Sequence, residues 1–90
     1  GLCGWGEAPQ LLKSGATAIE GRVPVNTGGG LLGSGHPIGA TGVRQVVETW
    51  RQMKGLCGDY QVPATPSLGV TANLGGDDRT GIVMVHRNCP

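Results

Sequence analysis

The sequence predicts an α/β fold class, with a βαββ core, a mixed sheet and a short N-terminal helix, in a single partial domain over residues 1–90. Two observations carry this prediction: an apolar stripe with helical spacing over residues 40–54, and two apolar runs near the C-terminus that flank a polar turn. A chain of this length can bury a modest core. Only Trp5, Trp50 and Tyr60 are aromatic, so we expect that core to be light.

Composition argues against several classes of function. The net charge is +1 and charged residues make up 14% of the chain, so neither nucleic acid nor a charged membrane surface is an expected partner. No apolar run is long enough to predict a membrane span, and no signal peptide is expected. The 18 glycines and 6 prolines cluster between patterned apolar segments, which favours a folded chain over a disordered one.

The first two predicted elements are short. A helix is expected over Glu7–Lys13, with Pro9 tolerated in its first turn and Gly15 as its stop. Alternating valines then predict a short strand over residues 23–25, which Pro24 confines to an edge or a strand end.

The clearest helix is expected over Ala40–Lys54. One apolar stripe recurs at three- and four-residue spacing and should pack into the core rather than hold a cofactor: Val43, Val46, Val47, Trp50 and Met53. Lys54 suits the last turn, and Gly55 is a fitting C-terminal stop.

Two strands are expected after a proline-broken connector, over Leu68–Ala72 and Gly81–Arg87. The polar turn between them predicts antiparallel neighbours, and the continuous apolar run of the second predicts burial on both of its faces. His86 should then be a partly buried strand residue. The strand over residues 23–25, the long helix and the strand after it would form a right-handed βαβ unit.

The three cysteines show no CxxC pair and no framework spacing. Cys3, Cys57 and Cys89 are therefore expected to be free thiols in a reducing compartment, the cytoplasm or an organelle. No metal site is expected, because His36 and His86 add no paired ligand spacing to these cysteines.

A glycine-rich loop, residues 28–39, surrounds one of the two histidines. The loop lacks both the P-loop pattern and a clean GxGxxG pattern, so phosphate or dinucleotide binding is not favoured. The glycines could serve only to permit tight turns, with His36 a satisfied loop residue. Alternatively, the small neighbours leave space for a ligand to reach an imidazole that can act as a base at neutral pH.

The stretch NTGGGLLGSGHPIGATGVRQVVE, Asn26–Glu48, closely resembles the C-terminal part of thiolases. Their GHP motif corresponds to Gly35, His36 and Pro37, preceded by the N-x-x-G-G pattern and followed by a G-A-[ST]-G helix entry. The resemblance covers nearly all of this chain but only the last part of a thiolase. It implies that residues 1–90 are the C-terminal part of a thiolase-fold domain whose N-terminal portion is the missing partner.

Thiolases catalyse Claisen condensation of acyl-CoA units or the reverse thiolytic cleavage. The resemblance therefore implies a coenzyme A thioester as substrate, no further cofactor and a homo-oligomer. It implies that His36 activates a nucleophilic cysteine and helps bind the thioester oxygen, while Gly35 and Pro37 contact the substrate. That cysteine motif is expected in the N-terminal portion, because Cys3, Cys57 and Cys89 lack its context.

A second family motif, C-x-G, aligns with Asn73, Leu74 and Gly75. The family cysteine exchanges the proton on the substrate α-carbon, and the glycine N–H helps form an oxyanion hole. Here Asn73 replaces that cysteine, and an amide cannot shuttle protons near pH 7. The replacement is similar to the sterol-carrier-protein branch of thiolases, in which an upstream motif carries a substitute cysteine.

Three functions remain open from the sequence. The first is a segment of a thiolase-like acyltransferase that holds the base but not the nucleophile, so that the isolated 90 residues are inactive. The second is a carbon–carbon lyase subunit that works with a partner, which Asn73 motivates. The third is a non-catalytic remnant whose exposed apolar faces seek a partner or self-associate.

Overall fold

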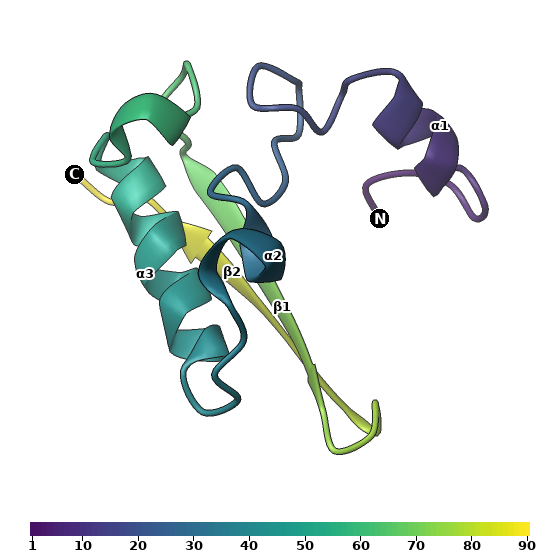
Figure 1. Cartoon of the computed structure of the whole chain (residues 1–90). Coiled ribbons are helices and arrows are strands. Elements are labelled where there is room, and N and C mark those ends of the chain that lie inside the picture. The colour runs from purple at the N-terminus through teal and green to yellow at the C-terminus, as the bar shows by residue number, and fades with distance from the viewer.

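The computed structural model describes all residues 1–90. Figure 1 shows a helix lying along a long β-hairpin, with the N-terminal segment extending away from both. The elements in chain order are α1 (Ala8–Lys13), α2 (Gly30–Ser34), α3 (Thr41–Met53), a short 3₁₀ turn (Gly58–Tyr60), β1 (Leu68–Gly75) and β2 (Thr80–Arg87). None of the helices has the length and apolar character that crossing a membrane requires. The predicted α/β class is confirmed.

The two predicted helices form close to their expected bounds. α1 begins after Glu7 and ends at Lys13, and Gly15 follows with a φ of +76° that favours glycine. α3 ends in a Schellman motif: Gly55 has a φ of +68°, and Leu56 N–H donates to the Arg51 carbonyl at 2.9 Å. Gly55 is therefore the stop that the sequence predicts.

β1 and β2 form the two-stranded antiparallel sheet that was expected near the C-terminus. Their register runs from Leu68 opposite Arg87 to Gly75 opposite Thr80. β1 is three residues longer than predicted, because the ladder continues up to the turn at residues 76–79. That turn carries Asp77 and Asp78 at positive φ, a conformation that Asp adopts more readily than most residues.

The strand predicted over residues 23–25 is wrong, and so are the mixed sheet and the βαβ unit that depended on it. Val23 N–H donates to the Ala16 carbonyl and Val25 N–H to the Thr17 carbonyl, at 3.0 and 3.1 Å. These donors are used within a local loop after α1, and Pro24 between them has no N–H to offer. The sheet of this chain contains β1 and β2 alone.

The hairpin has one covered and one uncovered face. Residues opposite each other in an antiparallel ladder share a face, so the register assigns Gly69, Thr71 and Asn73 to the face on α3. The other face carries apolar side chains that are 56% to 74% exposed: Leu68, Val70, Leu74, Val83 and Val85. The predicted burial of β2 on both faces is wrong for this chain: no second layer covers the outer face, and Ile82 and Met84 on the helix side are 55% and 39% exposed because α3 packs on β1.

α3 turns its apolar stripe away from the hairpin. Val43, Val47 and Trp50 are 48% to 66% exposed, so the predicted core packing is wrong for these three residues, whereas Val46 is half-buried and Met53 is buried. The helix packs on β1 through Thr49 and Met53, where a Cβ on Gly69 would lie only 3.1 Å from the terminal methyl of Met53. The absent side chain at Gly69 lets the helix approach β1 closely.

Gln52, at the C-terminal end of α3, links the helix by hydrogen bonds to the segment after it and to Thr27 before it. Its buried side chain donates to Thr27 Oγ1 at 2.9 Å and to the Tyr60 carbonyl at 2.7 Å, and it accepts from Val62 N–H at 3.0 Å. The small core lies beside it, in the buried residues Met53, Cys57 and Val62, which confirms the expectation of a light core.

We expect Gln52→Met to lower the free energy of unfolding by about 2–3 kcal/mol, because it leaves the buried Val62 N–H without a partner. Urea denaturation followed by circular dichroism measures this loss. Gln10→Met is the matched control, since Gln10 lies exposed on α1 and should change stability by less than about 0.5 kcal/mol. Equal stability of the two variants would contradict the role given to Gln52.

Candidate functional site

His36 lies exposed in the loop between α2 and α3. The preceding Gly35 has φ +73° and ψ 178°, a backbone conformation that is accessible essentially to glycine alone. Gly35 also ends α2, because its N–H donates to the Leu31 carbonyl at 2.8 Å. The glycine therefore turns the chain sharply at the end of α2 and presents the next side chain to solvent.

Thr41, the first residue of α3, forms a hydrogen bond with the His36 imidazole. Its Oγ1 lies 2.5 Å from His36 Nδ1 and donates a hydrogen bond to the Pro37 carbonyl at 3.2 Å. A hydroxyl has one proton, so a threonine that donates to Pro37 accepts from Nδ1–H. This network assigns the proton of the neutral imidazole to Nδ1 and leaves the lone pair of Nε2 free to act as a base.

Thr41 is well placed for this task because it is itself fixed. Its side chain and backbone are only 5% exposed. The Pro37 carbonyl also accepts from the backbone N–H groups of Ala40 and Thr41, at 2.9 and 3.1 Å. One carbonyl thus ties the GHP turn to the start of α3, so the orientation of His36 is set by a helix rather than by the loop.

Asn73 lies on the β1 face that packs against α3. It is half-buried, and its Nδ2 group donates to Gln45 Oε1 at 2.5 Å. Gln45 follows Thr41 by four residues, so the two side chains lie one turn apart on the same side of α3. α3 therefore supplies one polar partner to His36 and one to Asn73, and it brings both residues to its N-terminal half.

The remaining predicted site residues flank this arrangement. Gly35 and Pro37 are exposed on either side of His36. Gly75 is the last residue of β1, opposite Thr80. Alternation along the strand places Gly75 on the same face as Asn73.

The other histidine and the cysteines lie outside this site. His86 Nε2 is 3.1 Å from Thr71 Oγ1 across the hairpin, which confirms a half-buried strand residue. All three cysteines are free, as predicted; Cys57 is buried, whereas Cys3 and Cys89 are exposed. The neighbouring Cys57 is the main cause of a raised pKa at Tyr60, and partial burial of the phenol raises it further.

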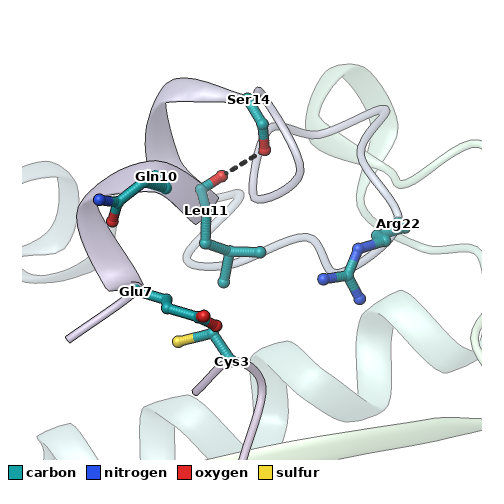
Figure 2. Close-up of a pocket in the computed structure, with 6 residues that line it drawn as sticks. All are labelled: Cys3, Glu7, Gln10, Leu11, Ser14 and Arg22. Atoms are coloured by element: carbon teal, nitrogen blue, oxygen red, sulfur yellow. Dashed lines mark hydrogen bonds between the residues drawn. The ribbon is translucent and has the colours of Figure 1, made fainter. Parts of the chain in front are cut away.

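One cavity of this chain lies away from His36. It measures about 380 Å³ and lies between α1 and Arg22, where Cys3, Glu7 and Ser14 also line it (Figure 2). The Glu7 carboxylate there accepts from Gly4 N–H at 2.8 Å, and Ser14 donates to a backbone carbonyl of α1. These polar groups are engaged locally, so the cavity adds no chemistry to the loop of His36. No group of three His, Cys, Asp or Glu side chains could hold a metal ion.

Thr41 and Gln45 were not among the site residues predicted from the sequence. Thr41 could have been found from its place five residues after His36, which brings the first helical side chain back to the GHP turn. Gln45 had no such signal, because a glutamine near the start of an amphipathic helix is usually a solvent-facing residue.

The chain matches the thiolase C-terminal domain-like family over residues 1–88. An acetyl-CoA acetyltransferase of Methanothermobacter thermautotrophicus is 41% identical over 80 residues, which cover 89% of this chain and 21% of that protein. The benzoylsuccinyl-CoA thiolase subunit BbsB of Thauera aromatica is 39% identical over 79 residues, 88% of this chain and 20% of that protein. Sterol carrier protein 2 of Rattus norvegicus is 40% identical over 88 residues, 97% of this chain and 16% of that protein. The chain spans about a fifth or less of the length of these relatives.

Proposed function

Since this chain belongs to the thiolase C-terminal domain-like family, we propose that it is the C-terminal segment of a thiolase-like acyltransferase acting on acyl-CoA. The segment supplies the base of the reaction, His36, and the nucleophilic cysteine comes from the N-terminal portion. The observation that carries this proposal is the hydrogen-bond network through Thr41, which engages His36 Nδ1 and leaves Nε2 of the neutral imidazole free to act as a base.

The chemistry follows from that free nitrogen. Nε2 accepts the proton of the cysteine thiol, and the thiolate attacks the thioester carbon. With an acyl-CoA, the bond between that carbon and the coenzyme A sulfur breaks, the acyl group stays on the cysteine, and the proton passes to the departing thiolate. With acetoacetyl-CoA, the cysteine thiolate attacks the keto carbon instead, the bond from that carbon to the CH2 group breaks, the acetyl group stays on the cysteine, and the departing acetyl-CoA carbanion takes the proton. While it carries the proton, Nε2–H can donate to the thioester oxygen as negative charge develops there. Gly75 N–H is proposed as a further donor to such an oxyanion, and Gly35 and Pro37 as substrate contacts.

The uncovered apolar surfaces support the need for the rest of the fold. The outer hairpin face and the Val43–Val47–Trp50 stripe of α3 are both exposed, and patches of this kind mark surfaces that pack against other protein. We propose that the N-terminal portion covers them, that the whole protein is a homo-oligomer, and that it works in a reducing compartment where its thiols stay free. Its substrate is a coenzyme A thioester, with no further cofactor.

A second candidate is a carbon–carbon lyase subunit that acts with a partner chain. Asn73 favours it, since the amide held by Gln45 cannot exchange protons as the family thiol does. The relative BbsB is itself named as a subunit, which supports action with a partner chain. A covalent acyl adduct on the whole enzyme would count against this candidate and for the acyltransferase.

The isolated 90 residues should cleave no acetoacetyl-CoA, because this chain holds the proposed base without the nucleophile. The measurement is coenzyme A consumption with the purified chain, followed over hours at micromolar protein. The control is the grafted enzyme, defined here as the Methanothermobacter relative in which this chain replaces the 80 aligned residues. We expect activity in the grafted enzyme only. Turnover by the isolated chain would contradict the proposal that the nucleophile lies in the N-terminal portion.

A further inference from the structure

A second cavity lies beside α3 and carries an excess of positive charge. It measures about 220 Å³ and is lined by six residues: Ser34, Arg44, Val47, Glu48, Arg51 and Tyr60. Arg44 and Arg51 are seven residues apart, so they lie two turns apart on one side of α3, with Glu48 between them. The lining therefore brings together two guanidinium groups and a single carboxylate.

The two arginines are only partly engaged within this chain. Arg44 Nη1 donates to Glu48 Oε2 at 2.8 Å, but Arg44 Nε is buried without a hydrogen-bond partner. Arg51 makes one long hydrogen bond, from Nη2 to the Leu56 carbonyl at 3.3 Å. A guanidinium offers five N–H donors in a planar fork that matches a carboxylate. Both side chains therefore retain donors for a second acidic group.

The cavity borders the part of α3 that the N-terminal portion is proposed to cover. Val47 belongs both to the cavity lining and to the exposed Val43–Val47–Trp50 stripe, so a segment that packs on the stripe also lies over the cavity. We propose that this segment places an aspartate or glutamate side chain between Arg44 and Arg51. The inference rests on the proposed function, in which the N-terminal portion covers α3.

The charge balance favours a carboxylate over an apolar or a basic group in this position. A segment packed over the cavity removes both guanidinium groups from water, and Glu48 can neutralise only one of them. An unpaired charge at a packed interface is costly, whereas a second carboxylate balances the cavity and can bind arginine in the bidentate mode. Such a pair also fixes how the covering segment is aligned on α3.

The first test is zero-length cross-linking in the grafted enzyme that carries Arg51→Lys. A carbodiimide joins a lysine amine to a carboxylate in contact with it, and peptide mass spectrometry identifies both residues. We expect the new amine to be joined to an aspartate or glutamate outside this chain. Arg79→Lys, at the exposed turn between β1 and β2, is the control and should not join that carboxylate. A link confined to acidic residues of this chain, whether Glu48 or those of a second copy, overturns the proposal, and so does the absence of a link.

The second test determines whether Arg44 serves Glu48 alone, through a double-mutant cycle on the thermal midpoint of the grafted enzyme. Arg44→Met should lower the midpoint by about 5 °C in the Glu48→Gln background as well as in the parent, because it leaves the second carboxylate buried without a partner. A loss that disappears in the Glu48→Gln background would refute the proposal.

Both measurements need a folded enzyme but no turnover. An inactive grafted enzyme would therefore count against the proposed function, while the cross-link and the midpoints still decide whether Arg44 and Arg51 receive a carboxylate.

Discussion

Replacing His36 with asparagine in the grafted enzyme should lower kcat/KM for acetoacetyl-CoA cleavage by about a thousandfold, within the range that a general base contributes. The reason is the loss of Nε2, the lone pair that the Thr41 network leaves free. His36 is exposed and bonds only through Nδ1, so the variant should fold and remain as stable as the parent.

His86→Asn is the matched control, since it alters the other histidine of the chain, whose contact is Thr71 across the hairpin. Its kcat/KM should stay within about threefold of the parent, because a residue away from the site affects the rate only through stability. Comparable losses in the two variants would mean that histidine 36 has no special part in the reaction.

Thr41→Val should lower kcat by about 10- to 100-fold, the loss found when the partner that orients a functional histidine is removed. Valine keeps the shape of threonine but cannot accept from Nδ1–H or donate to the Pro37 carbonyl. The imidazole can then carry its proton on either nitrogen, and the form with Nε2 protonated is not a base. Steady-state kinetics of the grafted enzyme measure the change.

Thr41→Ser separates this effect from packing. Serine keeps the hydroxyl and loses a methyl group at a site that is only 5% exposed, so it should cost stability but little kcat. A serine variant that is as slow as the valine variant would point to packing rather than to the hydrogen bonds of the threonine.

Local signals in the sequence were sufficient for the elements that depend on neighbouring residues. Helical periodicity and Gly55 predicted α3, because a Schellman stop needs only residues within two turns of one another. A polar turn between two apolar runs likewise predicted the β1–β2 hairpin.

Features that depend on distant partners were not predictable in the same way. Val23 and Val25 have strand character, but a strand needs a neighbour, and their N–H groups instead bond to the loop after α1. The periodicity of α3 identified its apolar side without saying that another face packs on β1 through the space at Gly69. Periodicity indicates which side of a helix is apolar. Which side is buried depends on the other elements that pack against the helix.

The candidate site shows the same difference between residues that local motifs predict and partners that only the fold brings near. The GHP motif predicted His36 as a site residue from the sequence, and the C-x-G alignment predicted Asn73. Their hydrogen-bond partners are Thr41 and Gln45, which only the structure reveals. α3 places these two side chains one turn apart, beside the loop and the strand. Such partners are ordinary polar residues by type, and geometry alone distinguishes them.

In the proposed function, this chain contributes the base and not the nucleophile of an acyl-transfer reaction. The most direct measurement is peptide mass spectrometry of the grafted enzyme quenched during turnover of acetoacetyl-CoA. The account predicts an acetyl adduct on a cysteine outside this chain, which His36→Asn abolishes. An adduct on Cys3, Cys57 or Cys89, or turnover without any cysteine adduct, would contradict it.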